Sequence, residues 1–230
     1  MVIAIDGPGG VGKSTVSRAV ARQLGIAYLD TGATYRAATL IALRCGVRLN
    51  DSNALVEEIS RHAIGYREGS ILLDGVPVDS AIRSDEVTRA VSEVSAHARV
   101  REHVVGIQRA WVDDNGGDAV VEGRDIGTVV FPDAEVKVFL TARPEVRAHR
   151  RALDAETEGA AVDEVAAALA ARDTADSTRE ASPMRQARDA TGIDTSDHTI
   201  AEVVAMIVAL VAEPGTPDSP DDGPSDAQEA

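Results

Sequence analysis

The sequence is poor in aromatic residues and cysteine, and it contains no long apolar run. Aromatic residues make up 3% of its 230 residues, so the core must be built from aliphatic side chains. The single cysteine, Cys45, excludes an internal disulfide framework and a metal site built from several cysteines. No apolar run reaches the roughly 18 residues that a membrane helix needs, and residues 1–6 do not resemble a signal peptide. We therefore expect a soluble cytoplasmic protein.

Positive charge is also scarce. The chain has 23 lysines and arginines against 38 acidic residues, for a net charge of −15. Nucleic acid polymers and anionic membranes both attract proteins through a large positive field, so neither is an expected partner. Residues 213–230 combine six acids and four prolines without any basic residue, which predicts a disordered tail. Only Lys13 and Lys137 are lysines, so any other cationic site must use arginine.

What the sequence does have is an alternation of short apolar runs with helical patterns. Strands are predicted at residues 2–6, 26–30, 119–122, 136–140 and 191–195. Helices are predicted at residues 13–24, 34–45, 87–110 (as one helix or two), 144–153, 160–172 and 199–212. This alternation indicates an α/β protein with a parallel sheet and helices on both faces. Three β-like pieces between residues 63 and 79 predict a small antiparallel sheet that interrupts the pattern.

A glycine-rich segment connects the first strand to the first helix. Its residues are Gly7-Pro8-Gly9-Gly10-Val11-Gly12-Lys13-Ser14, followed by Thr15. The spacing and the strand–helix context are those of a P-loop, in which backbone N–H groups and a helix N-terminus surround phosphate oxygens. Lys13 is expected to bridge the β- and γ-phosphates of ATP, and the Ser14 hydroxyl is expected to reach Mg²⁺. The motif predicts a nucleoside triphosphate without fixing the reaction.

Two common classes of P-loop protein do not fit. GTP-binding switches need a second lysine in a guanine-specifying element, and Lys137 lies in the unrelated context Val136-Lys137-Val138-Phe139. Motor and helicase ATPases usually end a strand in Asp-Glu, whereas the strands here end in Glu122-Gly123 and Leu140-Thr141. A small phosphotransferase is the better interpretation.

Three further clusters suit an anionic acceptor. They are residues 30–36 (DTGATYR), 122–128 (EGRDIGT) and 172–179 (RDTADSTR). The first two follow predicted strands, at the sheet edge where open α/β sheets bind ligands. The third has an arginine at each end, as expected of a lid that closes over phosphates, neutralises charge and excludes water.

These segments, together with Ile82-Arg83, Arg99-Val100-Arg101-Glu102 and Ile193-Asp194-Thr195, resemble the bacterial cytidylate kinases. The resemblance runs in order through residues 2–212. It implies a three-layer P-loop fold with a five-stranded parallel sheet, and a monomer that uses ATP, Mg²⁺ and CMP or dCMP. It also implies a kinase domain over residues 1–212, with a core (about 1–45, 106–160 and 186–212), an insert that binds the monophosphate (about 46–105) and a helical lid (about 161–185). Only the tail, residues 213–230, lies outside it.

The resemblance also implies roles for individual residues. ATP would be bound by Gly7, Pro8, Gly9, Gly10, Val11, Gly12, Lys13, Ser14 and Thr15. CMP would be bound by Thr31, Arg36, Ser92, Arg101, Arg124, Asp125, Arg172 and Asp176. Lys13, Arg124, Arg172 and Arg179 would be the catalytic residues, with Arg179 stabilising the transferring phosphoryl group. Asp125 would accept a hydrogen bond from the cytosine amino group, while Arg101 donates to the ring.

Two other functions remain open at this stage. The chain could be a small-metabolite kinase of the same broad fold, although an acceptor without phosphate would not need three converging arginines. It could also be a nucleotide-binding regulatory module without turnover. The five histidines show no metal-ligand spacing, and Cys45 is interpreted as a small residue that packs within a helix. Arg150 or Arg151 could lie near the base of ATP.

Overall fold

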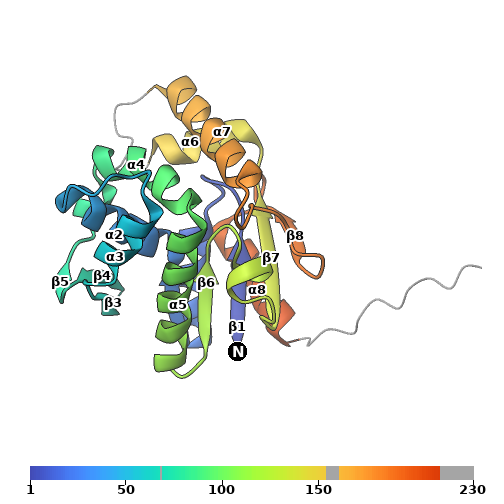
Figure 1. Cartoon of the computed structure of the whole chain (residues 1–230). Helices are drawn as coiled ribbons and strands as arrows, with labels where there is room; N and C mark the ends of the chain where they lie inside the picture. The colour runs from blue at the N-terminus through green and yellow to red at the C-terminus, as the bar shows by residue number, and fades with distance from the viewer. Residues whose placement is uncertain (68, 154–160, 213–230) are drawn as a thin grey trace, which may run out of the picture.

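A computed structural model describes residues 1–67, 69–153 and 161–212 of the chain. Its centre is a parallel sheet of five strands: β1 (Val2–Asp6), β2 (Ala27–Asp30), β6 (Ala119–Glu122), β7 (Val136–Thr141) and β8 (Thr191–Asp194). Their order is β2-β6-β1-β7-β8, so β1 lies between β6 and β7. The predicted five-stranded parallel sheet is therefore confirmed (Figure 1).

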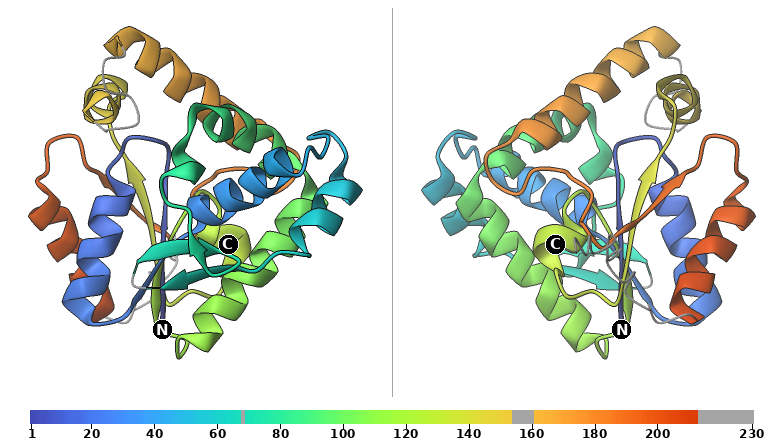
Figure 2. Two further views of the ribbon diagram at one scale, coloured as in Figure 1. Left: turned by 90° about the vertical axis from the view of Figure 1, so that its left-hand side faces the viewer. Right: turned by 90° about the vertical axis from the view of Figure 1, so that its right-hand side faces the viewer.

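Helices cover both faces of the sheet. On one face α1 (Lys13–Leu24) lies beside α8 (Ile200–Ala212), and on the other lies α5 (Ala98–Asp114) (Figure 2). The α8 face buries apolar residues such as Val20 and Ile207, and the α5 face buries Val112 and Val121. A capping box starts α8, because Thr199 and Glu202 each bond the backbone N–H of the other. The aliphatic composition is thus sufficient for two packed layers around the sheet.

An insert with its own core extends from the β2 side of the sheet. It contains α3 (Ser52–Ile59), the 3₁₀ turn η1 (Ala81–Arg83) and α4 (Asp85–Ala96). It packs with α2 (Thr31–Arg44), which the predicted bounds of about 46–105 leave outside the insert. It also contains the antiparallel strands β3 (Ile64–Arg67), β4 (Ser70–Leu73) and β5 (Val76–Pro77), as predicted. Ile41, Leu55, Ile71, Val94 and Val104 meet in its core, which therefore joins α2, α3, β4, α4 and the first half of α5.

Two helices lie beyond the carboxyl ends of the strands. They are α6 (Pro144–Ala152) and α7 (Val162–Thr178), drawn in yellow and orange in Figure 1. The predicted helix over residues 160–172 is too short, because α7 continues for six more residues and ends with Arg179 in an extended conformation. The cluster at residues 172–179 is therefore the end of a helix and its cap, which places Arg172 and Asp176 on one face.

The remaining differences from the sequence predictions are local. Residues 87–110 fall in two helices, α4 and α5, and α3 and the short π-helical turn η2 (Ile126–Val130) were not predicted. Cys45 is exposed at the end of α2, so its interpretation as a packed residue is wrong. No helix within the described residues is long and apolar enough to cross a membrane. The predicted disordered tail lies outside the described residues.

Candidate active site

A cavity of about 950 Å³ opens where the sheet, the insert and α7 meet. The P-loop lines it from Gly9 to Thr15, and the insert side contributes Thr31, Arg36 and Arg101. The remaining predicted residues that line it are Arg124, Asp125, Arg172, Asp176 and Arg179. Predicted site residues up to 170 positions apart in the chain therefore share one cavity. Of the predicted set, Gly7, Pro8 and Ser92 do not line it, whereas Ser95, one turn beyond Ser92 on α4, does.

The P-loop conformation depends on glycine at two positions. Gly7 has φ 145°, and a Cβ there would collide with the carbonyl oxygen of Leu140 on β7. Gly10 has φ 78°, and a Cβ there would lie 2.7 Å from the carbonyl oxygen of Arg147. Both positions combine left-handed backbone with close approach of another chain segment, which only glycine accommodates. These two glycines therefore allow the turn to pass close to β7 and α6.

Lys13 and Glu122 are oppositely charged buried residues at the floor of the cavity. The Lys13 ammonium donates to the Pro8 carbonyl at 2.6 Å, and its pKa is lowered by burial and by the charge of Arg124. Burial and the nearby Asp30 carboxylate raise the pKa of Glu122. The Tyr28 hydroxyl donates to Glu122, and the Ser14 hydroxyl bonds it as well. The sequence analysis gave Glu122 no individual role, although its place at the end of the strand beside β1 is a usable signal.

Five of the predicted site residues form one chain of ion pairs. Asp125 accepts from Arg101 at 2.6 Å and from Arg179 at 3.4 Å. Asp176 lies 3.5 Å from Arg179 and accepts from Arg124 Nε at 3.0 Å. These contacts join α5, the β6–η2 connection and α7. Arg101 and Asp125 are both buried, and their hydrogen bond fixes the orientation of both side chains. Removing either residue would leave the charge of the other buried without a compensating partner.

The three arginines predicted to bind phosphate lie close together. Burial and the charges of Arg124 and Arg36 lower the pKa of Arg172 to about 10. Arg36 is buried and donates to the Ile82 carbonyl at 3.0 Å and to the Thr88 hydroxyl at 2.8 Å, so the insert fixes its position. Like charges held this close repel one another, and an anion between them would relieve the repulsion. The cluster is therefore suited to bind a phosphate group.

Asp6 supports the acceptor side from the end of β1. Its two carboxylate oxygens accept from the backbone N–H groups of Ile126 and Gly127, each at 2.8 Å. Burial raises the pKa of Asp6 to about 6, while the two N–H groups favour the charged form. The contact fixes the backbone immediately after Asp125. Asp6 thus links the strand that precedes the P-loop to the position of Asp125.

Tyr35 is a further residue that the sequence analysis assigned no role. Its ring lies on α2 beneath the Arg101 guanidinium, 4.9 Å from ring centre to Cζ, in a cation–π contact. Its buried hydroxyl has no hydrogen-bond partner among the described residues, and burial raises its pKa to about 12. A tyrosine within an alanine-rich helix gives no sequence signal of a site, because the same pattern is typical of core packing.

The two helices beyond the strands also contact the P-loop. Asp173 on α7 accepts from the Gly9 N–H at 3.1 Å, and it pairs with Arg147 of α6. Arg147 also donates to the Gly9 carbonyl at 3.2 Å. Arg150 and Arg151 both line the cavity, and Arg150 donates to the Thr195 carbonyl at 2.7 Å. The proposed lid and the P-loop are therefore in direct contact.

Comparison with known proteins gives one consistent family. The sequence profile described as "Cytidylate kinase" matches residues 3–213. A cytidylate kinase of Mycobacterium leprae (strain Br4923) is 49% identical over 215 residues, which cover 93% of this chain and 96% of the relative. One from Streptomyces avermitilis is 45% identical over 217 residues, covering 93% of each chain.

Solved structures confirm the fold at lower identity. The crystal structure of TT1252 from Thermus thermophilus has a TM-score of 0.50 and 18% identity, and it covers 94% of this chain and 98% of that one. An uncharacterized protein from Eubacterium ventriosum has a TM-score of 0.52 and 13% identity, covering 92% of this chain and 98% of that one. At such identities the likeness extends to the fold alone.

Proposed function

This chain belongs to the cytidylate kinase family, and from this premise we infer that it transfers the γ-phosphoryl group of ATP to CMP or dCMP. The products are ADP and CDP or dCDP. The observation that carries the inference is the buried Arg101–Asp125 pair beside three clustered arginines in the P-loop cavity. The pair offers a donor and an acceptor to a base, and the cluster offers positive charge to its phosphate.

The donor nucleotide is assigned to residues 7–15. Backbone N–H groups of the loop and the N-terminus of α1 hold the phosphates, and Lys13 bridges the β- and γ-phosphates. Mg²⁺ suits the oxygen groups at this edge, because the Ser14 hydroxyl lines the cavity beside the buried Glu122 carboxylate. When bound, the ion neutralises charge on the triphosphate. Burial and the charge of Arg124 lower the pKa of Lys13, and anionic phosphates beside its ammonium would act in the opposite direction.

The acceptor is assigned to the ion-pair chain and the arginine cluster. Arg36, Arg124 and Arg172 bind the CMP phosphate, for which planar guanidinium groups are better suited than lysine. Asp176 binds the ribose hydroxyls with Thr31 nearby. Ser95, which lines the cavity and accepts from Arg101 through its carbonyl oxygen at 3.2 Å, takes the place beside Arg101 that was predicted for Ser92. The acceptor phosphate oxygen is already anionic, so it attacks the γ-phosphorus without a general base, and ADP leaves. Arg179 stabilises the charge on the phosphoryl group in transit, and catalysis consists of positioning and electrostatics.

Cytosine is selected through its amino group. That group donates to Asp125, whereas uracil would present a carbonyl oxygen to the same carboxylate. A buried acceptor left without a donor costs about 1–3 kcal/mol, which corresponds to roughly tenfold discrimination or more. Arg101 donates to Asp125 at 2.6 Å and so holds the carboxylate in a fixed orientation.

The chain is proposed to act as a cytoplasmic monomer with α7 as the lid. One chain supplies every residue assigned to the two substrates, so a second subunit is not needed to complete the site. Closure of α7 would bring Arg172, Asp176 and Arg179 onto the substrates together, because they lie at the end and cap of one helix.

An acceptor screen tests the proposed function. The full chain is incubated with Mg·ATP and one of CMP, dCMP, UMP, AMP or GMP, and ADP release is followed by a coupled assay. We expect CMP and dCMP to exceed the others at least tenfold in kcat/KM. A wide preference for UMP or AMP would contradict the assignment of Asp125, and no ADP release with CMP would favour a regulatory module.

A further inference from the structure

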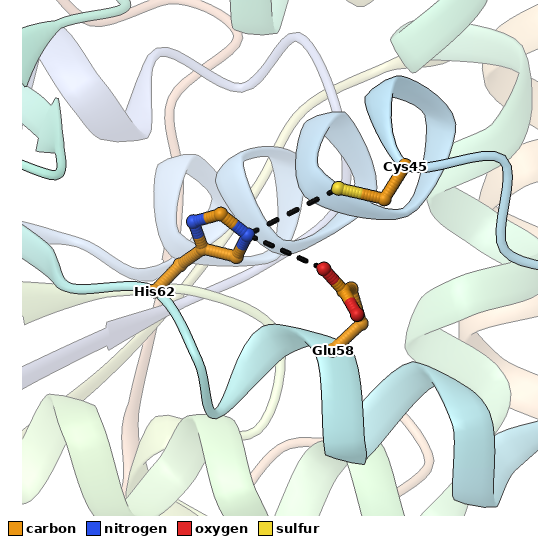
Figure 3. Close-up of side chains that lie close together, drawn as sticks. All are labelled: Cys45, Glu58 and His62. Carbon is orange, nitrogen blue, oxygen red and sulfur yellow. Dashed lines mark hydrogen bonds and ion pairs between the residues drawn. The ribbon is translucent and has the colours of Figure 1, made fainter.

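Three metal-ligating side chains meet on the surface of the insert, outside the cavity. Cys45 caps the end of α2, Glu58 lies in the last turn of α3, and His62 follows α3 before β3 (Figure 3). Their ligand atoms all lie within 4.8 Å of one another. None of the three lines the cavity, so this cluster has no part in the proposed reaction.

The distances within the cluster are close to those around a tetrahedral ion. His62 Nε2 lies 4.0 Å from Cys45 Sγ and 3.5 Å from a Glu58 carboxylate oxygen. Ordinary zinc–sulfur, zinc–nitrogen and zinc–oxygen bond lengths at tetrahedral angles place these pairs about 3.6 Å and about 3.3 Å apart. These two pairs would therefore need side-chain shifts of a few tenths of an ångström, while the Cys45 sulfur and the Glu58 oxygen lie within 4.8 Å of each other.

The histidine is already oriented as a metal ligand. Its Nδ1 lies 2.7 Å from Asp74 Oδ2, while its Nε2 points toward Cys45 and Glu58 (Figure 3). A ring whose Nδ1–H donates to a carboxylate has its lone pair at Nε2, the arrangement that second-sphere carboxylates impose on metal-binding histidines. Asp74 is itself held, because its Oδ1 accepts from the Ala63 N–H at 2.8 Å. It also has φ 51°, an uncommon backbone conformation for a residue other than glycine.

We propose that Cys45, Glu58 and His62 bind a zinc-like divalent cation, with water as the fourth ligand and Asp74 orienting His62. A thiolate and a carboxylate balance the double positive charge of the ion, and the sulfur and nitrogen ligands favour Zn²⁺ over Mg²⁺ or Ca²⁺. Arg61 forms ion pairs with both Glu58, at 2.7 Å, and Glu57. The ion pair with Glu57 can remain when the Glu58 carboxylate binds the metal ion. The ion would join the ends of α2 and α3 directly, and His62 would link it to Asp74 in the β4–β5 turn.

The single cysteine makes the test specific, because alkylation of the chain by iodoacetamide reports on Cys45 alone. The full-length chain is stripped of metal with a chelator, and alkylation is followed by mass spectrometry with and without one equivalent of Zn²⁺. We expect zinc to slow alkylation at least tenfold. His62→Gln and Glu58→Gln should each lose most of this protection. His149→Gln, which changes an exposed histidine on α6, should keep it.

Cobalt provides a second readout that does not depend on thiol reactivity. Co²⁺ added to the metal-free chain should give a thiolate-to-cobalt charge-transfer band at one equivalent, and Cys45→Ser should abolish it. The proposal is overturned if zinc leaves the alkylation rate unchanged. It is also overturned if protection persists in both His62→Gln and Glu58→Gln, since the cysteine would then bind zinc without the proposed partners.

Discussion

The donor side and the acceptor side of the cavity are built in different ways. The proposed donor side, residues 7–15, is one continuous segment that we expect to act largely through backbone N–H groups and one lysine. The acceptor side is a set of side chains from α2, α5, the β6–η2 connection and α7, joined by ion pairs. Its members are Arg36, Arg101, Arg124, Asp125, Arg172, Asp176 and Arg179.

This difference separates general from specific recognition. Phosphate oxygens are alike in every nucleotide, so a backbone cradle binds them without reading the base. A base is told apart by donors and acceptors in fixed directions, and those need side chains with partners of their own. Substitutions on the donor side should therefore lower the rate of transfer, whereas substitutions on the acceptor side should weaken recognition of CMP.

The largest effect is expected from Lys13→Met on the donor side. Loss of the only ammonium group at the triphosphate should lower kcat by about 10³-fold, because charge in the transition state is no longer neutralised. Binding of CMP, measured by titration calorimetry, should be unchanged. Lys13 is buried with a lowered pKa, so the variant should melt no lower than the wild type. A large loss of CMP affinity would show that the two sides are not separate.

Arg124→Met should produce the opposite pattern on the acceptor side. We expect kcat/KM for CMP to fall about 10²-fold or more, since one charged phosphate donor is lost, while ATP affinity changes little. Arg89→Met, which changes an exposed arginine on α4 outside the cavity, is the matched control and should retain activity. An unchanged KM for the acceptor would instead favour a kinase for a metabolite without phosphate.

A smaller effect is expected at Tyr35, which supports Arg101 without being assigned to the substrate. Tyr35→Ala removes the cation–π contact and should raise KM for CMP about fivefold. Tyr35→Phe keeps the ring and should change KM less than about twofold, because a phenyl face attracts the guanidinium as well. Equal losses in the two variants would mean that the hydroxyl contacts the nucleotide.

The smallest effect is expected from the C-terminal tail, which belongs to neither the donor side nor the acceptor side. Deleting residues 214–230 should change kcat/KM for either substrate less than about twofold, because this acidic, proline-rich sequence is predicted to be disordered. Steady-state kinetics of the truncated and full-length chains provide the measurement. A loss greater than tenfold would assign the tail a role in the reaction.

The sequence predicted the donor side more completely than the acceptor side, for physical reasons. The P-loop is local, so spacing within residues 7–14 and the flanking strand and helix suffice to define it. The acceptor arginines are scattered, and only their resemblance to a family identified them together. Ser92 illustrates the limit: its spacing along α4 does not show that Ser95, rather than Ser92, lines the cavity.

Other features depend on burial, which spacing does not reveal. Glu122 is an ordinary strand-end acid until its burial beside Lys13 is known. The continuation of α7 past Arg172 was missed because polar residues there are compatible with a loop as well as with a solvated helix face. The meeting of Cys45 with Glu58 and His62 depends on how α2 and α3 pack, although the three residues lie within 18 positions.

The central claim, that Asp125 reads the cytosine amino group, is tested most directly by one ratio. The ratio is kcat/KM for CMP divided by that for UMP, compared between the wild type and Asp125→Asn. The asparagine amide can donate to the uracil carbonyl oxygen, so we predict that the preference for CMP falls at least about tenfold. If both rates fall together and the ratio is unchanged, Asp125 only holds Arg101 and Arg179 in place, and the claim is wrong.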